Sequence, residues 1–203
     1  MSTLLIFGAG GHGRVVADAA LGAGAWSRVI ASDRDPQRCR GELLPGVPLL
    51  PIDEALAAAD GVHVAIGDAA SRRKEAVSLA AKPLATVVHP RASVSSHAAI
   101  GAGCFVAAQA VVAPGARLGS AVIVNHGAVV DHDVRVGDFC HVAPLAALGG
   151  GADLGTDVLV GSGASVLPGV RVAAGVVIGA GAAVCEDLAG PGRYAGVPAR
   201  RLG

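Results

Sequence analysis

The sequence predicts a small α/β domain with a parallel sheet, followed by a parallel β-helix of hexapeptide repeats. Two observations carry this prediction. From residue 94 to residue 184 every sixth position is Val, Ile or Leu, and the residues before this repeat alternate short apolar strands with helical segments. A period of six fits neither an α-helix nor a simple hairpin sheet, whereas it is typical of a β-helix whose coils stack short strands.

The repeat fills the second half of the chain. Sixteen positions follow the period of six without exception: Val94, Ile100, Val106, Val112, Leu118, Val124, Val130, Val136, Val142, Leu148, Leu154, Val160, Val166, Val172, Ile178 and Val184. The residue four places further on is always small or aliphatic, from Ala98 to Leu188. We expect the first set to point into the prism and the second to fill its corners, while Gly directly after the aliphatic residue permits the tight bend. The repeat makes about five three-sided coils over residues 89–190, and residues 191–203 form a C-terminal tail.

Residues 1–88 are predicted to form a Rossmann-like domain with a small parallel sheet. The expected strands span residues 3–7, 28–31, 62–66 and 85–89, and the expected helices span residues 14–21, 53–59 and 71–81. This alternation is typical of parallel strands joined by crossover helices. Asp53 is a candidate N-cap of the second helix, because its carboxylate can accept a hydrogen bond from a backbone N–H of the first turn.

A glycine-rich loop joins the first strand to the first helix. Gly8, Gly10 and Gly13 form the pattern G-x-G-x-x-G, and Asp33 follows twenty residues after the last of them. Such glycines let the backbone approach a phosphate at a helix N-terminus, and the acid can take a ribose hydroxyl. A tight strand–helix turn would explain the glycines equally, although such a turn has no need of His12. The domain is about half the size of a dinucleotide fold, so we expect room for one nucleotide.

The composition excludes several classes of protein. Sixteen basic and sixteen acidic residues give a formal net charge of zero over 203 residues, so nothing electrostatic indicates a nucleic acid or an anionic membrane as partner. Residues 92–116 carry no formal charge, but Gly and Pro interrupt this stretch, so membrane insertion is not expected. The N-terminus lacks the basic region of a signal peptide. The four cysteines form no CxxC pair and are expected to be reduced, buried residues of a cytoplasmic protein.

Three histidines of the repeat lie at outward positions. His126 and His132 each stand two places after an inward aliphatic residue, and His141 stands five places after one. A buried core histidine is therefore not expected at any of them, and the alternatives are a functional role or a solvated surface. Acids flank His132 on both sides, in Asp131-His132-Asp133. A neighbouring carboxylate can orient an imidazole and stabilise its protonated form, as a general base requires.

Four segments together carry a resemblance to a known family: GAGGHGRVVAD, VNHGAVVDHDVRVGDFCHVAP, the hexapeptide run and the closing YAGVPARRL. The chain resembles, over essentially its whole length, the bacterial sugar O- and N-acyltransferases. These include sialic-acid O-acetyltransferases and the N-acetyltransferases of nucleotide-linked 4-amino sugars such as bacillosamine and perosamine precursors. The resemblance implies a left-handed β-helix, a homotrimer with active sites between neighbouring β-helices, acetyl-CoA as donor and no metal.

The resemblance also implies roles for single residues. His132 is the expected general base, and Asp133 occupies the place of an acid, often Glu, that raises its proton affinity. Residues expected at acetyl-CoA are His141, Gly150, Ser162 and Ala180; residues expected at the sugar nucleotide are Gly10, Gly11, His12, Asp33, Gly67 and Arg72. Some relatives carry a second acid after Asp33, whereas this chain has Arg34, which can alter the nucleotide preference. The favoured reaction is N-acetylation of the 4-amino group of a nucleotide-linked amino sugar in glycan biosynthesis.

Three other functions stay open at this point. The first is O-acetylation of a sugar of the sialic-acid type. The second is a metal hydratase resembling the γ-class carbonic anhydrases, in which His126, His132 and His141 would bind zinc across a trimer interface; the nucleotide domain counts against it. The third is a nucleotide-sugar binding protein without enzymatic activity. His126 itself could be an alternative base or a structural hydrogen-bonding residue.

Overall fold

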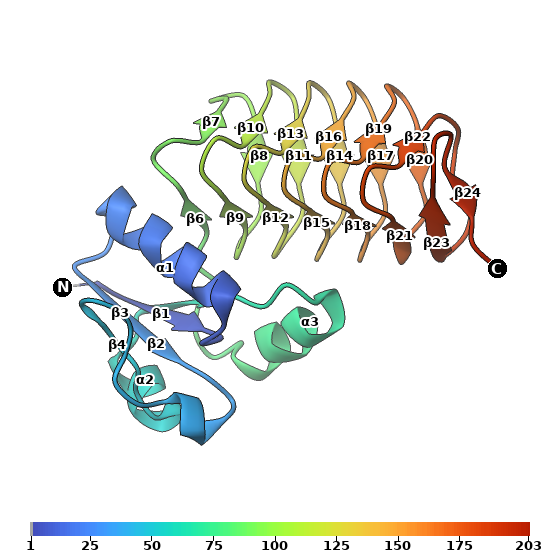
Figure 1. The fold of residues 1–203 in the computed structure, drawn as a ribbon. Coiled ribbons are helices and arrows are strands. Elements are labelled where there is room, and N and C mark those ends of the chain that lie inside the picture. The colour runs from blue at the N-terminus through green and yellow to red at the C-terminus, as the bar shows by residue number, and fades with distance from the viewer. Residues whose placement is uncertain (1) are drawn as a thin grey trace. The chain divides into compact units, whose positions relative to one another are not determined.

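A computed structural model describes residues 2–203 of the chain (Figure 1). The chain divides into two compact units, one ending at Pro90 and one beginning at Arg91. This division lies close to the predicted boundary after residue 88. The predicted fold class is confirmed: a small parallel α/β unit precedes a parallel β-helix.

The N-terminal unit is built on a three-stranded parallel sheet in the order β2-β1-β5. Its strands are β1 (Thr3–Phe7), β2 (Arg28–Ser32) and β5 (Gly61–Val64), and its helices are α1 (Gly11–Ala23), α2 (Ile52–Ala58) and α3 (Ala69–Ser78). A 3-10 helix (Pro36–Arg38), the hairpin β3 (Glu42–Leu44) and β4 (Val47–Pro48), and the short strand β6 (Val87–Val88) complete it. Every residue of β1 is buried, as expected for the central strand of a sheet covered on both faces.

Three details of this unit differ from the prediction. The strand expected over residues 62–66 ends at Val64, because the chain then leaves the sheet to form a loop. The strand expected over residues 85–89 is only two residues long, β6, and it does not belong to this sheet, which has three strands. Asp53 is not the N-cap of α2: Pro51 holds that position, and Asp53 lies in the first turn, where its charge complements the helix dipole.

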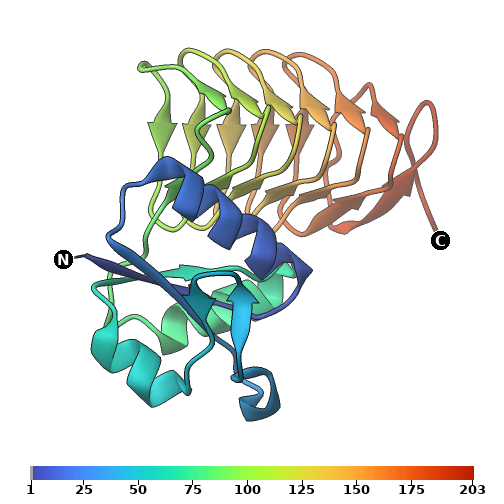
Figure 2. The same cartoon turned by 60° about the vertical axis from the view of Figure 1, so that its left-hand side comes forward.

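The C-terminal unit is a prism with three parallel sheets as its faces (Figure 2). The first face consists of β7 (Ser93–Val94), β10 (Val111–Val112), β13 (Val129–Val130), β16 (Ala147–Leu148), β19 (Ser165–Val166) and β22 (Ala183–Val184). The second face consists of β8 (Ala99–Ile100), β11 (Arg117–Leu118), β14 (Arg135–Val136), β17 (Asp153–Leu154) and β20 (Arg171–Val172). The third face includes β9 (Phe105–Val106), β12 (Ile123–Val124), β15 (His141–Val142), β18 (Leu159–Val160), β21 (Val176–Ile178), β23 (Gly192–Ala195) and β24 (Arg200–Arg201).

Each coil has 18 residues and stacks in register on the next, as the pairing of Val112 with Val130 shows. The predicted inward aliphatic residues are buried from Val106 onward, and so are the residues four places after them. The predicted core of the prism is therefore confirmed. The predicted tail does not stand apart: β23 pairs with β21, and β24 turns back antiparallel to β23.

The bends of the coil lie at a different position from the one predicted. The residue three places after the inward aliphatic adopts a left-handed conformation, for example Gly127 with φ 63°. The glycines directly after the aliphatic residue have ordinary φ values, and their function is close stacking. A Cβ on Gly101 would lie 2.5 Å from the carbonyl oxygen of Gly119 in the next coil. Glycine at this position therefore lets adjacent coils approach.

The cysteines only partly follow the expectation of burial. Cys104 and Cys140 are buried in the prism, Cys39 is half-buried, and Cys185 is exposed. No helix within residues 2–203 has the length and apolarity needed to cross a membrane.

His63 on β5 is fully buried, and its ring Nδ1 lies 2.9 Å from the carbonyl oxygen of Ala85. Burial lowers the pKa of His63 to about 4, since the charged imidazolium would lose its hydration. The unfolded chain therefore binds this proton at a higher pH than the folded chain does.

We predict that His63 lowers the free energy of unfolding by roughly 3 kcal/mol as the pH falls from 6.5 to 4, because the unfolded chain gains the proton first. Urea unfolding followed by circular dichroism at several pH values measures this slope. The variant His63→Asn should unfold at lower urea concentration but with a shallower pH dependence. An equal slope in both proteins would show that His63 is not the responsible group.

Candidate active site

The candidate base, His132, lies at the corner of the prism between the first and second faces. It stands in the turn between β13 and β14, two residues after the inward Val130, and 63% of its side chain is exposed. Asp133 follows it with φ 58°, the left-handed conformation that this position of the coil requires and that Asp tolerates. The local turn thus turns both side chains outward, next to each other.

His132 and Asp133 form a hydrogen-bonded pair. The ring Nδ1 of His132 lies 3.0 Å from Asp133 Oδ2, and the backbone N–H of His132 donates to Asp131 Oδ1 at 2.7 Å. The Asp133 hydrogen bond and the charge of Asp131 raise the pKa of His132 above its usual value. With its proton on Nδ1, the neutral ring presents the lone pair of Nε2 outward, which is the state that a general base needs.

Two glycines of adjacent coils make room for this pair. A Cβ on Gly150, one coil above, would lie 2.4 Å from His132 Nε2. A Cβ on Gly115, one coil below, would lie 2.4 Å from Asp133 Oδ1. The imidazole and the carboxylate are therefore seated against bare backbone. Within residues 2–203 the N–H of Gly150 donates to no other group, so it can serve an oxyanion beside Nε2.

His141 is held by a residue that the sequence analysis did not single out, Asn125. Asn125 Oδ1 accepts from the backbone N–H of His126 at 2.9 Å, which fixes the orientation of the amide. Its Nδ2 must then donate to His141 Nε2, 3.1 Å away. This contact places the proton of the neutral His141 ring on Nδ1. The sequence could have indicated this contact, because residues that are 16 apart lie diagonally opposite each other on successive 18-residue coils.

The remaining β-helix residues share the corner between the third and first faces. His126, Ser162 and Ala180 all stand two places after an inward residue of the third face, and all three are exposed. His132 and Gly150 occupy the other edge of the first face. One chain therefore carries two separate groups of predicted site residues, one at each edge of the first face.

The N-terminal unit contains a cavity of about 400 Å³ at the carboxyl ends of its strands. Its lining includes five of the predicted substrate residues: Gly10, Gly11, His12, Asp33 and Gly67. The sixth, Arg72, lies behind the lining. Its side chain is buried, and its Nη1 donates to the carbonyl oxygens of Ile66 and Gly67, both at 2.8 Å. Arg72 thus holds the loop that forms one wall of the cavity.

The glycines of the loop after β1 fall into two kinds. A Cβ on Gly13 would lie 1.9 Å from the carbonyl oxygen of Gly8, so the packing of α1 on the loop requires glycine there. Gly10 and Gly11 have no atom within 4 Å of such a Cβ, and both face the cavity. A tight turn explains the first kind only. The second kind leaves space for a ligand at the N-terminus of α1, which has no side-chain cap.

Asp33, which lines the same cavity, accepts hydrogen bonds from two backbone N–H groups. Its Oδ2 accepts from the N–H of Ala9 at 2.8 Å, and its Oδ1 accepts from the N–H of Asp35 at 3.0 Å. Each carboxylate oxygen keeps a lone pair for a ligand. Among residues 2–203, no group of three His, Cys, Asp or Glu side chains is arranged to hold a metal ion.

Comparisons with known proteins agree with this architecture. Residues 3–79 match the family model described as the PglD N-terminal domain. The acetyltransferase domain of PglB from Neisseria gonorrhoeae is 35% identical with a TM-score of 0.91, and the match covers 100% of both chains. The same domain solved with acetyl coenzyme A is 36% identical, with 98% of each chain covered and a TM-score of 0.91. A comparison with curated proteins gave no match.

A third similar structure is a histidine variant of GDP-perosamine N-acetyltransferase from Caulobacter crescentus in complex with CoA and GDP-perosamine. It is 34% identical, has a TM-score of 0.91, and matches over 100% of this chain and 98% of its own.

We predict that Gly150→Ala displaces the His132 ring while the fold stays intact, because the new methyl group would overlap Nε2. The ring resonances of His132 in NMR spectra report the displacement, and thermal unfolding reports stability. Gly151→Ala is the matched control: its φ of 69° makes Ala costly by about 1 kcal/mol, but no atom lies near its Cβ. If the His132 ring resonances of Gly150→Ala were the same as those of the parent protein, the His132 ring would not lie against Gly150.

We predict that Asp133→Asn lowers the pKa of His132, because the carboxylate that stabilises the imidazolium is lost. An NMR titration of the His132 ring measures the change. Asp153→Asn, which removes an equal charge from the second face, should leave the titration unchanged. A His132 pKa that is the same in Asp133→Asn as in the parent protein would contradict the assignment.

Proposed function

The chain belongs to the hexapeptide-repeat sugar acetyltransferases that carry a PglD N-terminal domain, and from this premise we propose its reaction. It transfers the acetyl group of acetyl-CoA to the 4-amino group of a nucleotide-linked amino sugar, in the cytoplasm, for glycan biosynthesis. The observation that carries the proposal is the His132–Asp133 pair seated beside the Gly150 amide. Family membership also removes the grounds for a metal hydratase or a binding protein without activity.

The proposed chemistry is a direct transfer. His132 Nε2 accepts the proton of the sugar amine as the nitrogen attacks the thioester carbonyl and the new C–N bond forms. Asp133 stabilises the imidazolium, and the N–H of Gly150 donates to the oxyanion. When the C–S bond breaks, the imidazolium returns the proton to the sulfur of CoA, which restores neutral His132. His141, whose ring is held by Asn125, contacts the acyl donor, and Ser162 and Ala180 line the pantetheine arm of CoA.

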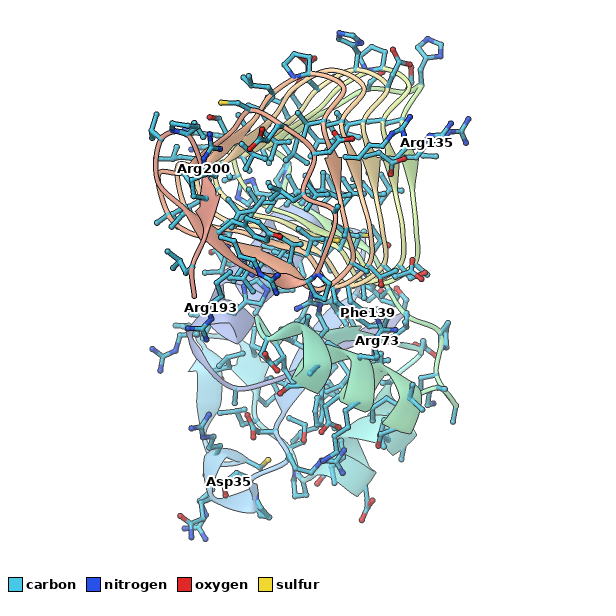
Figure 3. The ribbon with its side chains drawn as sticks, turned by 90° about the vertical axis from the view of Figure 1, so that its right-hand side faces the viewer. Asp35, Arg73, Arg135, Phe139, Arg193 and Arg200 are labelled. Atoms are coloured by element: carbon cyan, nitrogen blue, oxygen red, sulfur yellow. The ribbon has the colours of Figure 1, made fainter. Side chains whose placement is uncertain are left out.

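The proposal includes a homotrimer in which the first faces pack together, because the outward side chains of the first face are uncharged and those of the second face include charged residues. Outward side chains of the first face are small or apolar: Ser93, Val111, Val129, Ala147, Ser165 and Ala183. Those of the second face include Arg117, Arg135, Asp153 and Arg171, and Arg135 extends away from the prism in Figure 3. Packing first faces around a threefold axis would bring the His132 corner of one protomer beside the Ser162 corner of its neighbour. The site would then be complete only between protomers.

The N-terminal cavity supports a nucleotide-linked acceptor. Gly10 and Gly11 leave open space at the uncapped N-terminus of α1, where a diphosphate would be favoured by the helix dipole. Asp33 offers its remaining lone pairs to a ribose hydroxyl. An O-acetyltransferase acting on an unactivated sugar would have no use for these features.

Mass spectrometry of reaction products tests the proposal. The protein is incubated with acetyl-CoA and a panel of UDP-, dTDP- and GDP-linked 4-amino-4,6-dideoxy sugars, with free sialic acid included. One added acetyl group on a nucleotide amino sugar is the expected result. Acetylation of sialic acid alone would move the function to O-acetylation, and the absence of any product and of acetyl-CoA binding would contradict the proposal.

We predict that His132→Ala lowers kcat by about 10²–10⁴-fold, as loss of a general base requires. Since His132 must be unprotonated to act and its pKa is raised, the rate of the parent protein should fall as the pH drops through that pKa. The control is His126→Ala, which should keep most of the activity. The reverse outcome, with His126→Ala inactive and His132→Ala active, would assign the base to His126.

A further inference from the structure

We propose that Leu145 limits the length of the acyl group that the protein transfers, by closing one end of the channel along which the pantetheine arm of CoA lies. Leu145 stands in the turn between β15 and β16, at the corner between the third and first faces. This inference rests on the proposed function and deepens it, because it names a residue that sets the preference for an acetyl group over longer acyl groups.

Leu145 combines two properties that are each unfavourable for a leucine. It adopts a left-handed conformation with φ 61°, in which the side chain of an L-residue crowds the neighbouring backbone. It is also 73% exposed, so its apolar side chain gains little from burial within one protomer. Strained backbone of this kind is concentrated at functional sites. Glycine would serve the fold of a single protomer better, which indicates that the leucine has a function outside that fold.

Leu145 interrupts a row of glycines along this corner. The row consists of residues three places after the inward residues of the third face, with φ between 61° and 67°: Gly127, Leu145, Gly163 and Gly181. A Cβ on Gly163 or Gly181 would have no atom within 4 Å, so the row is open there. A Cβ on Gly127 would lie 2.8 Å from Leu145 Cδ2. The leucine side chain therefore lies over Gly127 and fills the row at that level.

The open part of the row lies beside the residues that we propose for the pantetheine arm. Ser162 directly precedes Gly163, and Ala180 directly precedes Gly181. An arm that passes Ala180 and then Ser162 reaches, one coil further toward the N-terminal end of the prism, the level of Leu145. The thioester end of the channel is therefore the end that the leucine closes.

The height of His132 places the acyl group at the same level. Packing of the first faces around a threefold axis parallel to the prism would keep every residue at its own height along the prism. His132 follows Gly127 and precedes Leu145 along the coil, so it would face the neighbouring protomer at a height between these two residues. The acyl chain leaves the thioester carbonyl on the side opposite the sulfur. With the pantetheine arm on one side, the chain is directed at the Leu145 side chain on the other.

The space that Leu145 fills decides which acyl groups fit. The single methyl group of an acetyl donor can end in van der Waals contact with the leucine, whereas a longer chain would have to displace it. One additional methylene group in such an apolar site typically changes kcat/KM by about 10–200-fold. Without the leucine side chain, the row would be open as far as Gly127.

Initial rates with acetyl-, propionyl- and butyryl-CoA, measured on the nucleotide amino sugar that the protein acetylates, test this assignment. The parent protein should show a kcat/KM for acetyl-CoA at least about tenfold above that for propionyl-CoA. Leu145→Gly should reduce this ratio about fivefold or more, chiefly by raising kcat/KM for the longer donors. Since glycine tolerates φ 61°, thermal unfolding and size-exclusion chromatography should match the parent protein. Leu145→Ala should act in the same direction and keeps the test decisive where Leu145→Gly does not fold.

Gln109→Gly is the matched control. Gln109 has the same phase and the same φ of 61°, but it lies two coils away from Leu145. This variant should keep the parent ratio. A parent protein that uses propionyl-CoA as readily as acetyl-CoA, an unchanged ratio in the Leu145 variants, or an equal change in Gln109→Gly would overturn this inference and leave the proposed function standing. Transfer of no acyl group to any nucleotide amino sugar would overturn both.

Discussion

The candidate active site depends on one constraint, the register in which successive coils of the prism stack. Because each coil has 18 residues, positions far apart in the chain become neighbours whenever they share a phase of the repeat. His132 meets Gly150 in this way, and Asp133 meets Gly115. Glycine has different roles at different phases of the repeat: some glycines bend the coil, some let the coils approach, and Gly115 and Gly150 leave room for the His132–Asp133 pair. Insertion of one residue between them would separate the pair from its seat.

The same stacking explains how an exposed histidine can be preorganised without burial. His132 keeps most of its surface open to solvent, yet its ring is defined by the Asp133 hydrogen bond on one side and bare backbone on the other. His141 is fixed differently, because Asn125 receives a backbone N–H and so must donate to the ring. The two imidazoles are therefore held by different groups, His132 by a carboxylate and His141 by an amide. The orientation of each ring follows from its neighbours on the coil.

Much of the fold could be predicted from the sequence, because a period of six and strand–helix alternation are local signals. The pair His132–Asp133 was also predictable, since its members are adjacent in the chain. Other features depend on contacts that the sequence does not display. The Asn125–His141 contact joins successive coils, and the ion pair of Arg34 with Glu75 joins residues 41 apart in the chain. Arg72 lies behind the cavity and holds the loop that forms one of its walls. From the sequence, the bend was predicted at the glycine directly after the inward residue, but the bend lies two residues further on. The presence of a glycine does not tell whether the chain needs a left-handed conformation or close packing at that position. The functional roles of single residues came from family resemblance.

In the reaction that we propose, His132 of one protomer removes the proton of the acceptor amine while a neighbouring protomer holds the acyl donor. A crystal structure of the protein with CoA and the nucleotide amino sugar that it acetylates tests this most directly. We expect the amine nitrogen within hydrogen-bonding distance of His132 Nε2. The CoA sulfur should lie near the Gly150 amide, and the pantetheine arm should lie along Ser162 and Ala180 of the adjacent protomer. An amine placed away from His132, or CoA bound along the charged second face, would contradict it.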